Sequence, residues 1–173
     1  MNKIIGARGN IQDTDSFLKQ VISFVKKHHV IIQVFDADMI FGKAHLISSV
    51  KHAIRAMEIK TNTTNSLDKE ILLYASGERQ IKLSISKMGI KKGNGNIAFV
   101  FVNDVKAGDS ELSDHLVDEV LDSFSLVRDD SVLEGDIDTL RAFGINENEI
   151  KTVAKAKYGH LILEKVAVVD IIK

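Results

Sequence analysis

The 173-residue sequence is 45% hydrophobic and 27% charged, a composition typical of one soluble globular domain. Its 23 Lys and Arg against 24 Asp and Glu give a net charge of -1, which excludes a generally basic nucleic-acid coat but leaves room for a local basic patch. It contains no Cys, which excludes disulfides, thiolate metal sites and a cysteine nucleophile.

The sequence shows neither a signal peptide nor a membrane segment. Residues 1–10 carry only Ile4 and Ile5 as an apolar pair, which is too short for the apolar core of a signal peptide. The longest apolar run, 97–102, is far shorter than the ~20 residues of a membrane helix. We therefore expect a cytoplasmic protein with no membrane partner.

In the first half of the chain, short β-branched runs alternate with helical periodicity. The expected elements are a strand at 3–7, a helix at 13–27, a strand at 30–35 and a helix at 43–60. In the helix at 43–60 the apolar positions are Leu46, Val50, Ala53, Ile54 and Met57, and the polar side carries His45, Ser48, Lys51, His52 and Arg55. A polar loop at 61–65 and helices at 67–74 and 78–88 follow.

The second half begins with a Gly- and Asn-rich turn at 91–96 and an apolar run at 97–102, which predicts a central buried strand. We then expect a loop at 104–109, a helix at 110–124, an irregular acidic segment at 129–136, short helices at 137–143 and 147–157, and a last helix at 161–172. No linker divides the chain. The pattern predicts a single α/β (α+β) domain over 1–173, with several helices packed on a small mixed β-sheet.

No motif in the sequence builds a catalytic or metal site. The glycines at 93 and 95 precede a strand, whereas a phosphate-binding loop follows one and opens a helix. Ser76 lacks the surroundings of a nucleophile elbow. His45 and His52 are two helical turns apart, too far to share a metal unaided, and Asp36 and Asp38 are typical of a turn or helix cap. We expect a protein that is not an enzyme, without metal or cofactor.

Two surfaces remain as candidate sites. The first is basic, with Lys43 and Lys60 bounding one helix and with Arg79, Gln80 and Lys82 opening the helix after Gly77. Residue types alone favour a solvated helical face over a binding surface. The second is the last helix, where Leu161, Val168 and Ile172 lie on a different face from Ile162, Val166 and Val169. A helix that is apolar on two sides is either buried or docks a partner.

The run at 70–81, EILLYASGERQI, is similar to a signature of archaeal Cgi-one-twenty-one proteins, the small subunits of the KEOPS complex that are called TPRKB in animals. Agreement extends in order over most of the chain, at 36–38, 42–46, 65–67, 87–90, 129–134 and 163–167. The ASGERQI part is specific, because no general structural rule requires it.

The resemblance implies a non-catalytic accessory subunit that supports threonylcarbamoyladenosine modification of tRNA. Its expected partners are a Bud-type atypical kinase, the 3′ CCA end of tRNA and, indirectly, the catalytic threonylcarbamoyl transferase subunit. It implies that Arg79 and Gln80 contact RNA, that Ser76 and Gly77 allow close backbone approach, and that Lys43, Lys60 and Lys82 supply phosphate charge. The kinase contact is expected at Leu161, Val168 and Ile172. The alternative is a structural module that docks the kinase without touching RNA, with Ala75, Gly77 and Ile81 serving helix packing.

Overall fold

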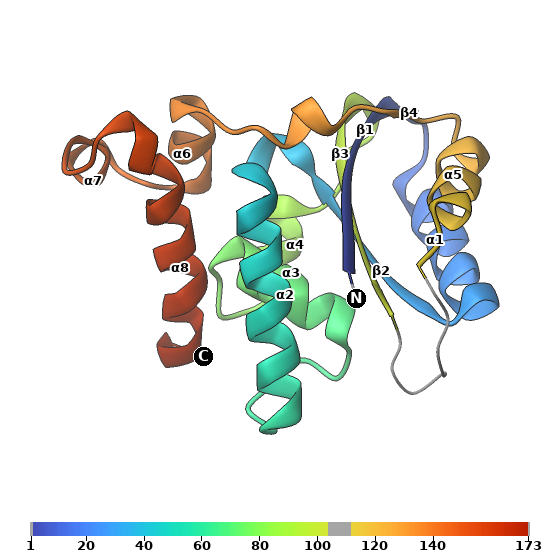
Figure 1. Cartoon of the computed structure of the whole chain (residues 1–173), viewed down its shortest axis with the longest axis horizontal. Helices are drawn as coiled ribbons and strands as arrows, with labels where there is room; N and C mark the ends of the chain where they lie inside the picture. Colours follow the sequence, from blue (N-terminus) through green and yellow to red (C-terminus); the bar gives the residue numbers. More distant parts are fainter. Residues whose placement is uncertain (1, 104–111, 173) are drawn as a thin grey trace.

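The computed structural model describes residues 2–103 and 112–172, and the loop expected at 104–109 lies outside them. A β-sheet runs between two layers of helices (Figure 1). The elements in chain order are β1 (Asn2–Ile11), α1 (Thr14–His28), β2 (Val30–Asp36), η1 (Ala37–Met39), α2 (Gly42–Glu58), α3 (Leu67–Ser76), α4 (Ile81–Met88), β3 (Gly93–Asn103), α5 (Asp114–Ser123), β4 (Val127–Arg128), η3 (Asp130–Leu133), α6 (Ile137–Phe143), α7 (Glu147–Lys151), η4 (Lys155–Lys157) and α8 (Tyr158–Ile172).

The four strands of the sheet have the order β2-β3-β1-β4. β3 pairs with β1 from Asn2↔Val102 to Ile11↔Gly93 and with β2 from Val30↔Asn103 to Asp36↔Ile97. Each of these pairings is antiparallel, as is that of β4 with β1, so the sheet is antiparallel rather than mixed. The α/β fold class predicted from the sequence is confirmed.

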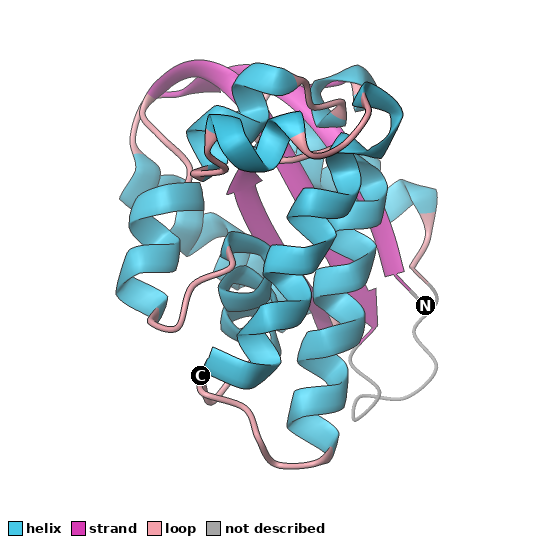
Figure 2. Ribbon diagram, turned by 90° about the vertical axis from the view of Figure 1, so that its left-hand side faces the viewer, coloured by secondary structure: helices cyan, strands magenta, loops and turns pink. Residues whose placement is uncertain are grey.

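Alternation along the strands divides the core into two clusters, one on each face of the sheet. Ile5, Phe99 and Phe101 pack on one face against α1 and α5, where Phe17 and Phe124 bring their ring centroids to 4.2 Å. The opposite face is covered by the layer that contains α2, α3, α4 and α8. Figure 2, seen from the α8 side, shows the helices of this layer in front of the strands.

α2 and α8 lie side by side and run in the same direction. Phe41, just before α2, packs against Gly159 at the start of α8, where a Cβ would be 3.4 Å from the ring. Further along, His52 Nδ1 is 2.8 Å from Asp170 Oδ2. None of the helices within 2–103 and 112–172 is both long and apolar enough to cross a membrane.

Some element boundaries differ from the prediction. The turn expected at 91–96 is largely strand, because Gly95 and Asn96 pair with Gly9 and Arg8 in the long β1–β3 ladder. α4 begins at Ile81 instead of 78, and the helix expected at 147–157 is divided into α7 and η4. These boundaries depend on long-range pairing and packing, which local periodicity does not contain.

Candidate functional site

The turn between α3 and α4 lies in the middle of the run at 70–81. α3 ends in a left-handed cap at Gly77, whose φ of 68° favours glycine. Gly77 donates its N–H to Tyr74 O at 3.1 Å, and Glu78 donates its N–H to Leu73 O at 3.4 Å. These N–H groups are therefore used inside the cap and are not free to donate to a ligand.

Ser76 is fully buried, which corrects its prediction as an RNA contact. Its Oγ lies 2.9 Å from Leu73 O and 2.8 Å from Ser84 Oγ, so the hydroxyl links α3 to α4. A small polar side chain at this position is explained by the close packing of two helices. The serine of the ASG motif is structural.

Lys87 holds the turn from the α4 side. Its Nζ donates to Ser76 O at 2.8 Å, lies 3.3 Å from Glu78 Oε1, and sits 3.8 Å from the ring centroid of Phe143. A cation at the carboxyl end of α3 also interacts favourably with the helix dipole. Burial lowers the pKa of Lys87, with Glu78 opposing this effect. Sequence reasoning did not find this anchor, because its partners come from three separate elements.

The side chains directly after the cap point to solvent. Arg79, Gln80 and Lys82 are exposed, and the described residues offer Arg79 and Lys82 no ion-pair partner within 4 Å. Leu83 and Ile85 on α4 are also exposed, at 49% and 54%. This turn therefore presents a guanidinium, an amide and an ammonium beside apolar surface, a combination suited to a phosphate and the face of a base.

Lys43 and Lys60, predicted to join the same basic patch, lie elsewhere. Lys43 forms an ion pair with Asp130 at 2.7 Å, on the side of α2 that faces η3. Lys60 follows the opposite end of α2, a 17-residue helix that is about 25 Å long. α3 runs back along α2, since His45 near the start of α2 bonds to Ala75 near the end of α3. Arg79 is therefore separated from Lys60 by most of the length of α2.

His45 is only 1% exposed, so its assignment to the polar side of α2 is wrong. Phe41 N–H donates to its Nδ1 at 3.3 Å, and its Nε2 lies 2.8 Å from Ala75 O. Both contacts are satisfied by the neutral ring protonated on Nε2. Burial lowers the pKa of His45 to about 4, the Lys87 charge adds to this, and the Ala75 bond opposes it.

The C-terminal end of α8 is linked to α2 and α3 by polar contacts. Asp170 contacts His52 Nδ1 at 2.8 Å and accepts a hydrogen bond from the Tyr74 hydroxyl. Burial, followed by the contact with Asp170, raises the pKa of Tyr74. These three polar side chains fix the register between α8 and its two neighbours.

Beyond this tie, α8 exposes apolar side chains. Ile171 is 82% and Ile172 37% exposed, and Val168 is half-buried. His52 is level with Asp170, so Ile171 and Ile172 lie about one turn or less beyond this tie, whereas the 57% exposed Ile59 follows α2 about 10 Å further along. Leu161, predicted as a partner contact, is instead buried in the core on the helical side of the sheet that contains α2 and α3. The apolar end of α8 is thus displaced toward its C-terminus relative to the prediction.

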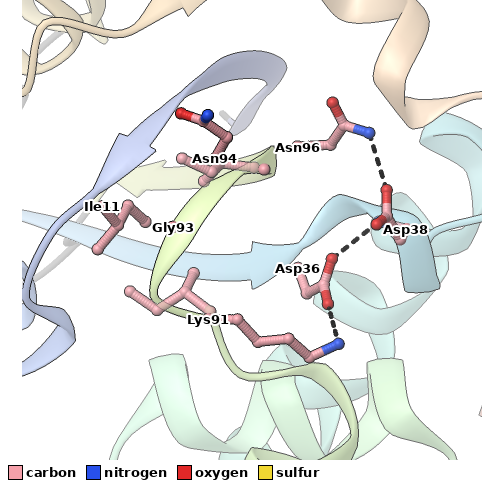
Figure 3. Close-up of a pocket in the computed structure, with 10 residues that line it drawn as sticks. Ile11, Asp36, Asp38, Lys91, Gly93, Asn94 and Asn96 are labelled. Atoms are coloured by element: carbon pink, nitrogen blue, oxygen red, sulfur yellow. Dashed lines mark hydrogen bonds and ion pairs between the residues drawn. The ribbon is translucent and has the colours of Figure 1, made fainter.

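A small pocket of about 90 Å³ lies where β2 meets the start of β3 (Figure 3). Asp36 accepts the N–H of Asp38, as expected for a cap, and its Oδ2 is 2.6 Å from Lys91 Nζ. Asp38 Oδ1 accepts from Asn96 Nδ2 at 2.8 Å. Across the described ranges, no group of three or more His, Asp or Glu side chains is arranged to hold a metal ion. Both carboxylates serve the local fold.

Comparison with known proteins identifies the family of the chain. Residues 9–170 match the family described as "Kinase binding protein CGI-121". The chain belongs to this family. It is also 39% identical, over 62 residues, to the "Regulatory protein Cgi121" of Methanocaldococcus jannaschii; the match covers 36% of this chain and 40% of that relative.

In this CGI-121 chain, the run at 70–81 separates into structural and exposed positions. Glu70 is fully buried and accepts from the N–H groups of Thr63 and Thr64 and from the Thr64 hydroxyl, which fixes the loop before α3. The middle of the run, including Tyr74 and Ser76, is buried as well. Only its last part, with Arg79 and Gln80, faces solvent and remains available to a partner.

Proposed function

We propose that this chain is a non-catalytic regulatory subunit of a KEOPS-type complex that acts in the cytoplasm. In this role it binds a Bud-type kinase and helps recruit tRNA for threonylcarbamoyladenosine modification. The observation that carries the proposal is the match to a kinase-binding family over residues 9–170. Through the kinase, the chain would act indirectly on the catalytic threonylcarbamoyl transferase subunit.

The apolar end of α8 is the proposed kinase contact. Ile171 and Ile172 form its apolar part. An apolar centre with a polar rim is the usual composition of a specific protein interface. Exposed isoleucines gain free energy when a partner covers them, at roughly 25 cal/mol per Å² of apolar surface.

Isothermal titration with the purified kinase tests this contact. We expect Ile171→Glu to weaken binding by about tenfold or more, because the carboxylate would be desolvated in the interface. The matched control is Ile22→Glu, which introduces the same charge at a 52% exposed isoleucine of α1 on the opposite layer. Equal affinities of the two variants would contradict the assignment of α8.

The α3–α4 turn is the proposed contact for the single-stranded 3′ CCA end. Arg79 can fork onto a phosphate or stack on a base, Gln80 can pair with a base edge, and Lys82 adds charge. Leu83 offers apolar surface next to them. Because the net charge of the whole chain is -1, binding should be local, salt-sensitive and weak for the isolated subunit.

Arg79→Glu tests this contact directly. We expect tRNA affinity to fall by about tenfold or more while kinase affinity is unchanged. The charge-matched control is Lys19→Glu, at an exposed residue of α1. If Arg79→Glu binds tRNA as well as the control does, the RNA-recruiting role fails.

The second candidate function is a structural module that docks the kinase without touching RNA. The burial of Ser76 and the internal use of the Gly77 N–H favour it, because they remove two of the predicted RNA contacts. Kinase binding without measurable tRNA binding would establish this alternative.

A further inference from the structure

The segment that joins α7 to α8 is rich in lysine. Residues 151–160, KTVAKAKYGH, contain three lysines and no acidic residue. Lys151 is the last residue of α7, and Lys155 and Lys157 bound the short helix η4. The three lysine side chains are exposed. In Figure 1 this segment forms one extremity of the molecule, away from the sheet.

These lysines differ from the charged residues around them in having no ion pair. Nearby Arg141 is bound to Asp138 and Glu147, and Lys165 is bound to Glu149 at 2.8 Å. We call Lys151, Lys155 and Lys157 the 151–157 lysines. Within the described ranges, no carboxylate lies within 4 Å of their ammonium groups. Arg141 and, more weakly, Lys151 lower the pKa of Glu147, but none of the three lysines is held in a direct ion pair, so their exposed ammonium groups are available to an anionic partner.

The segment is connected to the α3–α4 turn through α8. A Cβ at Gly77 would lie 3.4 Å from Lys165 Cβ, so α8 touches the turn at this level. From Tyr158 to Lys165 the helix rises by about 10 Å. The 151–157 lysines and Arg79 are thus separated by a distance that one bound nucleic acid can span, with Lys165 and Lys87 between them.

The chemistry of the two regions differs. The turn combines a guanidinium, an amide and apolar side chains, which can contact unstacked bases. The basic segment offers ammonium groups separated by small exposed residues, Ala154 and Ala156, and its aromatic Tyr158 is half-buried. Lysines act as point charges on phosphates and carry little base specificity. Such a surface suits the backbone of a base-paired RNA helix, whose deep, narrow major groove keeps side chains from its base edges.

We infer that the 151–157 lysines form a second RNA-contact surface, which binds the phosphate backbone of the base-paired stem beside the single-stranded tail held at Arg79. This inference rests on the proposed function and adds a separate, sequence-independent contact to it. Few apolar side chains accompany the lysines, so the segment lacks the apolar face that inserts into a lipid surface.

The test uses the full chain and RNA hairpins that reproduce an acceptor stem, with and without a 3′ CCA overhang. The variant is Lys151→Gln/Lys155→Gln/Lys157→Gln, and the control Lys19→Gln/Lys26→Gln/Lys92→Gln removes three exposed lysines elsewhere. We expect the variant to bind both hairpins at least about tenfold more weakly than the control at low salt. The slope of log association constant against log salt concentration should be less negative by roughly three for the variant than for the control.

The outcomes separate this inference from the proposed function. If the lysine variant weakens both hairpins and removal of CCA has no effect, the stem contact stands and CCA recruitment fails. If removal of CCA weakens binding but the variant behaves as the control does, the stem contact is wrong. It is also wrong if wild-type protein binds neither hairpin, or if the variant loses binding to phosphatidylserine vesicles and keeps its affinity for RNA.

Discussion

Acidification should destabilise this protein through His45 before its carboxylates protonate. The ring is 1% exposed and is held neutral between Phe41 N–H and Ala75 O. In the folded chain its pKa lies at about 4, below the ordinary value of 6.5. The unfolded chain therefore binds more protons than the folded chain between these values, so stability falls as pH decreases from 6.5 toward 4.

The magnitude follows from the displacement of the pKa. Each tenfold change in proton affinity corresponds to about 1.4 kcal/mol, so the total loss is ~3 kcal/mol once pH is below 4. Between pH 7 and pH 5 the expected loss is about 2 kcal/mol. The lowered pKa values of Asp13, Asp114 and Glu119 affect stability only below their ordinary range near pH 4, outside this interval.

Urea unfolding at pH 7, 6 and 5 measures this loss, and the comparison with His45→Gln isolates it. The variant should be less stable at pH 7, because a buried polar contact is lost, but its stability should depend less on pH over the interval. His160→Gln, at an exposed histidine, should retain the wild-type dependence. If His45→Gln keeps the full dependence, or if NMR shows His45 titrating near pH 6.5, the reasoning is refuted.

Substitutions at three further positions test what holds the two ends of α3: Gly77 and Lys87 at the α3–α4 turn, and Glu70 at the loop before α3. Gly77→Ala should cost about 1 kcal/mol in unfolding free energy, because φ is 68° there; an unchanged urea midpoint would contradict this. Lys87→Met should remove the donor to Ser76 O and lower the unfolding free energy by about 1–3 kcal/mol in the same assay. Lys87→Arg, which keeps a cationic donor, should lose less stability than Lys87→Met, and equal losses would contradict the role of this hydrogen bond. Glu70→Gln should cost about 1–3 kcal/mol and raise hydrogen exchange at the Thr63 and Thr64 amides, and full protection in this variant would refute the role of Glu70.

The sequence predicted the elements well where one periodic pattern determines one buried face. α2 shows the limit of this approach. Leu46, Val50 and Ala53 face the core as predicted, but His45 and Ser49 are also buried, because α2 packs against both α3 and α8. A prediction from amphipathic periodicity assumes that only one face of the helix is buried. The second face of α2 is buried by α8, which lies about 100 residues later in the sequence.

The candidate site was predicted in part, for similar reasons. The motif identified the α3–α4 turn, where Arg79 and Gln80 are exposed and stay predicted RNA contacts. Ser76 was misassigned, because its partner Ser84 lies on the next helix and local pattern does not reveal the contact. Lys60 was grouped with Arg79 because it ends the basic helix that a short connection joins to the next one, yet the reversal of the chain between α2 and α3 places the two residues at opposite ends of α3.

Titration of the purified chain with tRNA tests the central claim most directly. Full-length tRNA and tRNA lacking its 3′ CCA are compared at low and moderate salt, since phosphate contacts weaken as salt rises. The account predicts that the truncated tRNA binds about tenfold or more weakly. Equal affinity for both tRNAs, or no binding of either, would contradict recruitment through the 3′ end and leave a kinase-docking module.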